Sequence, residues 1–150
     1  SRGVIMLWHS DVSRRKQVGD ECEVDFVRRV TCSCGGRFSF IGNLRYGFLD
    51  FTCGYCGQLV DVKCSPQAER TGNISVSRRP FDEYASDVLI VTRINREWFW
   101  EYKSNIHVLN KTPLQSTHKS QIGPLKDTDF YLISWRGFRR LTEMGFTVTA

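Results

Sequence analysis

The stretch of sequence that decides the fold is residues 32–64, which read CSCGGRFSFIGNLRYGFLDFTCGYCGQLVDVKC. It contains three short runs of strand-forming residues, at 37–41, 46–51 and 59–64. Turn-forming residues separate these runs, with Gly42 and Asn43 in the first gap and the glycine-containing segment 53–57 in the second. The pattern predicts a three-stranded meander.

Four cysteines bracket the first hairpin of this meander: Cys32, Cys34, Cys53 and Cys56. Zinc prefers four tetrahedral sulfur or nitrogen ligands, and one turn can supply two cysteines that lie two or three positions apart. If residues 34–53 form a hairpin, its midpoint falls between Asn43 and Leu44, and both cysteine pairs meet at its open end. We therefore expect a structural zinc ion in a zinc-ribbon-like clip over residues 32–56, in preference to free thiols or two disulfides.

A second candidate site lies on the third run. Its alternation over residues 60–63 places Asp61 and Lys63 on the face opposite the valines. Pairing the second and third runs about the 53–56 turn puts Asp50 opposite Asp61. Opposed like charges destabilise a sheet, so this pair requires a counter-charge from Lys63 or from a metal ion such as Mg²⁺, which prefers oxygen ligands. Such an ion would activate water for phosphodiester hydrolysis; the alternative is the solvated face of an amphipathic strand.

These residues resemble the pattern of the PD-(D/E)xK nuclease superfamily, whose members share the restriction-endonuclease-like fold. That pattern has an acid on the first helix, an aspartate at a strand end, and an acid-x-Lys element on the next strand. Asp50 matches the strand aspartate, and Asp61 and Lys63 match the acid-x-Lys element. Glu23 matches the helix acid. Leu49 stands where the family commonly has proline, and Asp61 where it commonly has glutamate.

The resemblance implies an α/β fold, with a mixed β-sheet flanked by helices, in a single domain over residues 1–150 with the zinc clip embedded in it. It implies an endonuclease that depends on Mg²⁺ or Mn²⁺ and cleaves DNA rather than RNA. Asp50 and Asp61 would hold the metal ion. Glu23 would assist directly or through water, and Lys63 would position the nucleophile.

Periodicity and turn residues predict the remaining elements. Helices are expected over residues 20–30 and 134–144, and strands over 88–94, 130–134 and 146–149. Residues 65–84 read as a loop with a short helix near 81–85, and 103–128 as a long irregular loop. The aromatic cluster Trp98, Phe99 and Trp100 favours core packing over base stacking.

The net charge of +5 and the pI near 9.0 favour an acidic partner such as nucleic acid. Two basic clusters are candidates for contacts with the phosphate backbone, although each also fits a solvated face: Arg14, Arg15 and Lys16, and Arg136, Arg139 and Arg140. No apolar run reaches the roughly 20 residues of a membrane span, so no membrane partner is expected. A homodimer or a domain of a larger protein is compatible with the sequence.

Zinc-binding thiolates favour a reducing compartment, which predicts a cytoplasmic, nucleoid or nuclear protein that is not secreted. Cys22 and Cys64 lack the zinc spacing and are expected to be small core residues. A second interpretation of the whole chain is a non-catalytic zinc-ribbon module that binds nucleic acid or protein. A third is a structural subunit or an inactive relative of the nucleases.

Overall fold

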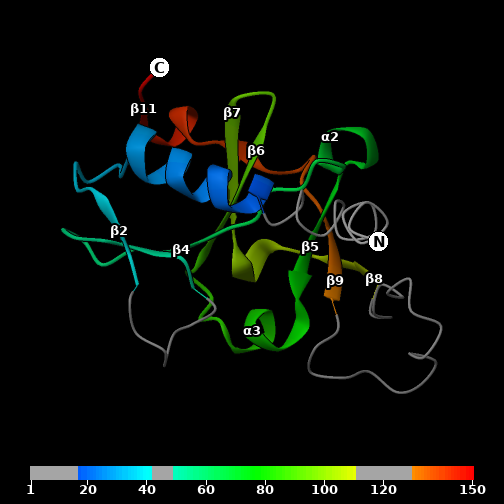
Figure 1. Ribbon diagram of the computed structural model, residues 1–150. Coiled ribbons are helices and arrows are strands. Elements are labelled where there is room, and N and C mark those ends of the chain that lie inside the picture. Colours follow the sequence, from blue (N-terminus) through cyan, green and yellow to red (C-terminus); the bar gives the residue numbers. More distant parts are fainter. Residues whose placement is uncertain (1–16, 42–48, 111–129) are drawn as a thin grey trace, which may run out of the picture.

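The computed structural model describes residues 17–41, 49–110 and 130–150. Over these ranges the chain is a mixed α/β protein of mostly antiparallel strands with few helices (Figure 1). The strands are β1 Val30–Thr31, β2 Phe38–Phe40, β3 Phe51–Cys53, β4 Leu59–Val62, β5 Asn73–Ser77, β6 Leu89–Ile94, β7 Glu97–Tyr102, β8 Val108–Asn110, β9 Phe130–Ser134, β10 Arg139–Arg140 and β11 Thr147–Val148. The helical segments are residues 17–29, α2 Ala68–Thr71, α3 Arg78–Glu83 and the 3-10 turns η2 Lys103–Asn105 and η3 Thr142–Met144. No helix within the described ranges is long and apolar enough to cross a membrane.

A six-stranded sheet, in the order β10-β7-β6-β4-β3-β2, forms the centre of the fold. The meander predicted from residues 32–64 is confirmed as β2, β3 and β4, which pair antiparallel. After β4 the chain passes through α2, β5 and α3 and returns as β6, which runs parallel to β4 with Val60 opposite Leu89. Strand β6 is mostly buried along its length, which is why its sequence is a nearly continuous apolar run.

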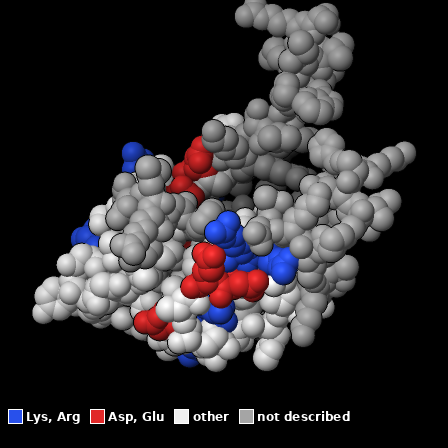
Figure 2. Space-filling view, turned by 90° about the horizontal axis from the view of Figure 1, so that it is seen from below, with Lys and Arg blue, Asp and Glu red and all other residues white. Residues whose placement is uncertain are grey.

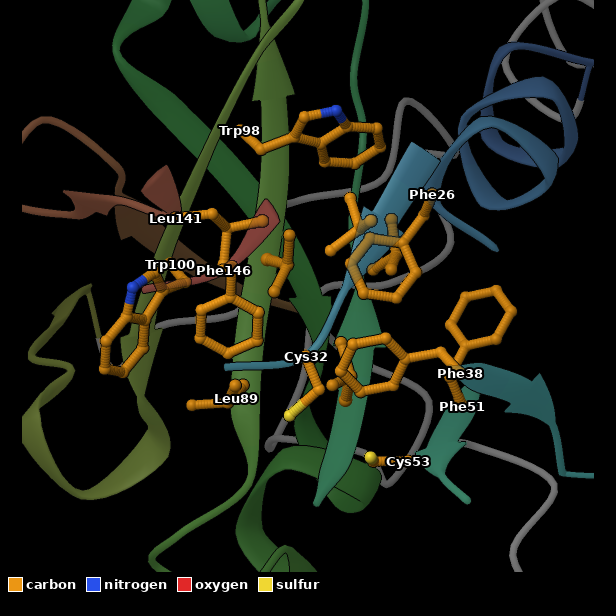
Figure 3. Packing of buried hydrophobic residues seen from close by; sticks show 14 of the residues in the cluster. Phe26, Cys32, Phe38, Phe51, Cys53, Leu89, Trp98, Trp100, Leu141 and Phe146 are labelled. Carbon is orange, nitrogen blue, oxygen red and sulfur yellow. The ribbon is translucent and has the colours of Figure 1, made fainter. Parts of the chain in front are cut away.

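The helix of residues 17–29 packs against one face of this sheet (Figure 1). The helical spacing that predicts a helix over 20–30 is confirmed, because Cys22, Phe26 and Val30 are fully buried. The Phe26 ring contacts three rings, those of Phe38, Phe51 and Trp98, at centroid distances of 5.0, 5.1 and 5.5 Å (Figure 3). Burying one such side chain stabilises a fold by roughly 1.5–3 kcal/mol, so this aromatic cluster fixes the helix on the sheet.

Polar contacts fix the orientation of the same helix. Asp25 accepts a hydrogen bond of 2.8 Å from Arg93 of β6. At the end of the helix, Arg37 donates to the carbonyl oxygens of Val27 and Arg28 at 3.2 and 3.4 Å. These carbonyls belong to the last turn, which has no partners within the helix. Arg37, which directly follows Gly35 and Gly36, therefore also caps the C-terminal end of this helix.

A second core lies on the other face of the sheet. It contains Ile90 of β6 together with Ile74, Val76 and Ile133 from a smaller sheet in the order β5-β9-β8. The short helix α3 adds Pro80 and Phe81, which are buried. The central sheet is therefore covered on both faces, and a polar side chain on β4 has apolar surroundings whichever way it points.

Two expectations for the outer elements are wrong, and one is confirmed. The helix predicted over residues 134–144 is absent, because Trp135 to Phe138 form a turn and Arg139 and Arg140 pair with β7 as β10. Residues 65–84 contain the strand β5 in addition to two short helices. The aromatic residues near position 98 lie on a full strand, β7, on which Trp98 and Trp100 are buried as expected.

The hairpin between β6 and β7 turns through two residues with positive φ, Asn95 at 51° and Arg96 at 66°. Ile94 pairs with Glu97, so these two residues are the whole loop. A two-residue loop with both residues left-handed is a type I′ turn, in which Asn-Gly is the preferred pair. Arginine at the second position carries the steric cost of a left-handed side chain.

We expect Arg96→Gly to raise the free energy of unfolding by about 0.5–1 kcal/mol, because glycine adopts positive φ without strain. Urea denaturation of the two proteins measures this difference. Arg79→Gly serves as the control, since Arg79 is an exposed helical residue and its loss should destabilise. A fall in stability on Arg96→Gly would contradict the turn assignment.

Candidate metal centre and carboxylate site

The four predicted zinc ligands meet at one point. The Sγ atoms of Cys32, Cys34, Cys53 and Cys56 all lie within 4.8 Å of one another. The Cys32–Cys56 and Cys34–Cys53 sulfur distances are 3.7 and 3.5 Å. Zinc–sulfur bonds of about 2.3 Å in a tetrahedron require sulfurs about 3.8 Å apart. The cluster therefore fits a zinc ion, and four thiolates would leave no open coordination position.

Two glycine-containing turns build this cluster. In the first, Gly36 donates its backbone N–H to Cys34 Sγ at 3.3 Å, and a Cβ on Gly36 would lie 2.5 Å from Cys53 Sγ. In the second, Gly57, with φ of 78°, donates to the Cys53 carbonyl at 3.0 Å. Only glycine fits the first position, because any side chain there would overlap a ligand sulfur.

The register that joins these turns differs from the prediction by four residues on the first strand. Phe38, and not Cys34, pairs with Cys53. The predicted turn at Gly42 and Asn43 lies outside the described residues. The cysteine pairs still meet at the open end. The shift arises because Cys32 and Cys34 lie in a separate turn before β2.

The four thiols differ in burial and in acidity. Cys32 and Cys53 are buried beside the aromatic core (Figure 3), whereas Cys34 and Cys56 are exposed. Burial raises the pKa of Cys32 to about 12. Burial also acts on Cys53, but hydrogen bonds from the backbone N–H groups of Cys56 and Tyr55 outweigh it and lower its pKa to about 7. Zinc binds thiolates, so occupancy of the cluster would release protons.

We expect purified protein to contain one zinc ion per chain and Cys53→Ala to contain none. Because structural zinc contributes directly to folding, the variant should also unfold at a lower temperature, or be unfolded throughout. Elemental analysis and circular dichroism measure the two effects. Ser33→Ala, which changes an exposed residue between Cys32 and Cys34 in the other turn of the cluster, is the control and should keep its zinc. A metal-free wild type that remains equally stable would contradict the assignment.

The predicted catalytic residues also come together. Glu23 lies on the first helix, Asp50 immediately before β3, Asp61 within β4 and Lys63 just after β4. The register predicted for the β3–β4 hairpin is confirmed, with Phe51 opposite Val60 and Thr52 opposite Leu59. Continuing this register places Asp50 opposite Asp61.

Hydrogen bonds connect these side chains in a chain. Glu23 bonds to Asp50, and Asp50 bonds to Asp61. Asp50 Oδ2 also accepts the backbone N–H of Val62 at 2.7 Å. Lys63 Nζ lies 3.3 Å from Asp61 Oδ1. A bond between two carboxyl groups requires a shared proton, so the three acids do not all ionise together without a further cation.

Tyr84, which the sequence did not single out, joins the site from the end of α3. Its hydroxyl donates to Asp61 Oδ2 at 2.9 Å. Burial, reinforced by the charge of Asp61, raises the pKa of this phenol far above its ordinary value, so it remains a donor. The contact spans 23 residues, and no local sequence signal predicts it.

Asp61 has the most unusual environment of the three acids. It is 1% exposed, and burial raises its pKa to about 8 despite the opposing charge of Lys63. Burial also raises the pKa values of Asp50 and Glu23. Oδ1 of Asp61 has no geometrically ideal hydrogen-bond donor among the described residues, and its charge partner is the Lys63 ammonium at 3.3 Å. A buried carboxylate oxygen needs such a cationic partner.

The carboxylate site is looser than the cysteine cluster. Among the described residues, only the cysteines bring three or more metal-ligating atoms within 4.8 Å of one another. Asp50 and Asp61 form a pair, and Glu23 adjoins the pair from the first helix, with its strongest side-chain interaction to Asp50. A metal ion held by two carboxylates keeps most of its water, which is typical of Mg²⁺ and its close analogue Mn²⁺.

The predicted phosphate-binding residues find other partners or lie outside the described residues. Arg139 lies 3.5 Å from Glu101 and 4.4 Å from the centre of the Trp100 ring, and Arg140 lies 3.4 Å from Glu97. The guanidinium of Arg136 lies against Gly72. Arg14, Arg15 and Lys16 lie outside the described residues. On the face shown in Figure 2, basic and acidic side chains adjoin one another, so its described residues form no uniform basic patch.

Cys22 and Cys64 were expected to be separate core residues. Both contribute to the first core, but a disulfide joins them, with a Cα–Cα distance of 6.4 Å. The bridge links the helix to the end of β4, and its two cysteines directly adjoin Glu23 and Lys63 in the sequence. The spacing of 42 residues carries no local signal for this pairing.

No protein-family model matches the chain, and no curated protein matches it. The functional interpretation therefore depends on the geometry of the two sites.

The raised pKa of Asp61 predicts a pH dependence of stability when no divalent ion is added. The carboxyl has its ordinary pKa of 3.8 in the unfolded chain and about 8 in the folded one. Between these values the folded protein binds more protons than the unfolded chain, so stability falls as pH rises. Asp61→Asn should reduce this decline, leaving the part that comes from the raised pKa values of Asp50 and Glu23, and should be more stable at pH 8 by on the order of 1–3 kcal/mol.

Chemical denaturation of zinc-replete protein between pH 5 and 8.5 measures this difference. Asp82→Asn is the matched control, because Asp82 also accepts a hydrogen bond from a tyrosine but is exposed. An Asp61→Asn variant that is less stable than the wild type at pH 8 would contradict the burial argument.

Proposed function

We propose that this chain is a metal-dependent nuclease of the PD-(D/E)xK class, with a restriction-endonuclease-like fold, that hydrolyses phosphodiester bonds in DNA. One observation carries the proposal. Asp50 and Asp61 oppose each other on adjacent strands, Lys63 Nζ lies 3.3 Å from Asp61, and Glu23 bonds to Asp50. These four residues are the ones that the resemblance assigns to catalysis, and they converge from three separate elements.

The order of elements supports the same class. A helix precedes a three-stranded meander, and a crossover that contains helices leads to an apolar strand beside the meander. The acid-x-Lys element lies on the meander strand that adjoins this apolar strand. The four-cysteine cluster is not part of the family pattern. It lies at the turn of the β3–β4 hairpin, whereas Asp50 and Asp61 lie at the open end. Its closed coordination suits a structural role.

The residues of the site divide the chemical work. A Mg²⁺ or Mn²⁺ ion held by Asp50 and Asp61 would polarise the phosphate and acidify a bound water. Lys63, whose side chain is 32% exposed, connects the buried acids to solvent and can orient an attacking water. Glu23 hydrogen-bonds Asp50 and so keeps it directed at the site. Asp61 must lose its proton to act as a ligand, so activity should rise between pH 6 and 8.

The proposal is tested by incubating the protein with supercoiled plasmid, linear duplex, single-stranded DNA and RNA, each with Mg²⁺, Mn²⁺ or no added metal. We expect metal-dependent cleavage of DNA, and a loss of at least about 100-fold in Lys63→Ala, since positioning of the nucleophile accounts for factors of this size. Lys103→Ala is the matched control, because Lys103 lies over the Phe81 ring and outside the site.

The outcomes separate the three interpretations of the sequence. Cleavage that is lost in Lys63→Ala and retained in Lys103→Ala supports the nuclease. Binding of nucleic acid without cleavage under any condition would favour the zinc-ribbon module, for which Tyr55, 82% exposed between two zinc ligands, is a ready contact. Neither binding nor cleavage would favour a structural subunit.

A further inference from the structure

Tyr84 contacts the carboxylate site through a single polar atom. Its hydroxyl lies 2.9 Å from Asp61 Oδ2, and both side chains are buried, at 9% and 1% exposure. The two oxygens of Asp61 therefore face different partners. Oδ2 accepts from the phenol, whereas Oδ1 lies 3.3 Å from Lys63 Nζ and has no hydrogen-bond donor among the described residues.

The backbone of Tyr84 is itself held in place. It follows α3, and its N–H donates to the carbonyls of Pro80 and Phe81 at 3.0 and 3.3 Å. Phe81 is buried, and its ring packs edge-on against the Tyr131 ring at 5.8 Å. The phenol thus reaches Asp61 from a fixed position in the second core, on the side opposite the first helix.

We propose that Tyr84 is a positioning residue that holds the Asp61 carboxylate in the rotamer in which Oδ1 is presented to a divalent cation. The inference rests on the proposed nuclease function and adds a residue that the family pattern does not supply. An aspartate side chain has two torsions beyond its Cβ, χ1 and χ2, and χ2 sets the directions in which its two oxygens point. A hydrogen bond to one oxygen fixes that torsion, and partners of this kind orient the ligands of metal sites.

Without the phenol, Asp61 is free to turn both oxygens towards Lys63 or Asp50. The Lys63 ammonium already lies 3.3 Å from Oδ1, and an unrestrained carboxylate would pair with it through either oxygen, so a divalent cation would compete less well and the metal affinity would fall. Partners of metal ligands typically account for about 10- to 100-fold in affinity or activity. We expect a loss of that size in Tyr84→Phe, which removes only the hydroxyl and keeps the ring that fills the core.

Tyr131→Phe is the matched control. Its hydroxyl donates to Asp82 Oδ2 at 3.0 Å, the same kind of bond at nearly the same length, but outside the site. Both variants lose one phenol-to-carboxylate bond. The Tyr84 bond is buried and the Tyr131 bond is exposed, so Tyr84→Phe is expected to lose more stability, and metal binding is compared under conditions in which both variants are folded. Weaker metal binding in Tyr84→Phe than in Tyr131→Phe would show that the contact of the Tyr84 hydroxyl with Asp61 matters for the metal site.

Three readouts are measured on zinc-replete protein: Mn²⁺ affinity, the Asp61 carboxyl resonance and the kinetics of DNA cleavage. Electron paramagnetic resonance with Mn²⁺ gives the dissociation constant, and carboxyl ¹³C resonances of labelled aspartate, assigned with Asp61→Asn, report on Asp61 without added metal. We expect Tyr84→Phe to shift the Asp61 resonance and weaken Mn²⁺ binding 10- to 100-fold, with kcat for DNA reduced at saturating metal and KM for DNA unchanged. Tyr131→Phe should match the wild type in all three.

A Tyr84→Phe variant with the wild-type Asp61 resonance and Mn²⁺ affinity would overturn the proposal. A wild type that binds Mn²⁺ and shows the Tyr84 effect but cleaves no nucleic acid would overturn the nuclease function and leave the positioning role intact. A wild type that binds no Mn²⁺ would overturn both. If Tyr84→Phe fails to fold, the same comparison is made in the Arg96→Gly background.

Discussion

The antiparallel register between β3 and β4 is the constraint on which the rest of the structure depends. Phe51 opposite Val60 sets Asp50 against Asp61 at one end of the hairpin and brings Cys53 to the zinc cluster at the other. A shift of one residue would turn every side chain of a strand to the opposite face. The acids would then face the aromatic core, and Cys53 would leave the cluster. The metal clip and the carboxylate site are thus two consequences of one set of backbone hydrogen bonds.

The two sites have opposite effects on the free energy of folding. Four sulfurs in tetrahedral arrangement gain stability when zinc binds, and the clip secures the open end of the meander next to Phe38 and Phe51. The acids are costly, because Asp61 is buried and ionising it beside Asp50 and Glu23 would bring like charges together. Carboxyl groups with pKa values raised in this way cluster at functional sites and also occur in structural ion-pair networks. The aromatic packing around Phe26 and the four-cysteine cluster both adjoin the strands that carry the acids.

Sequence reasoning succeeded where the signal was local. The cysteine spacing, the meander, the first helix and the alternation around Asp61 all depend on residues close together in the chain, and the structure places them as expected. Sequence reasoning failed for the segment 134–144. Arginine is a good helix former, but Arg139 and Arg140 pair with β7, and this tertiary contact outweighs their helix propensity. It missed β5, whose partner β9 follows more than fifty residues later. The Cys22–Cys64 bridge was missed for the same reason.

By itself, the sequence determined which residues are available for each site: four cysteines in two short-range pairs, two aspartates on neighbouring strands, and a lysine two positions beyond one of them. Only the tertiary structure decided how these residues behave. The crossover through α3 brings Tyr84 to Asp61, and the cover on both faces of the sheet removes that carboxyl from water and raises its pKa to about 8. The physical reason is that the sequence directly gives the identity of each side chain. The burial of a side chain and the charges around it depend on segments that are distant in the sequence and come together only when the chain folds.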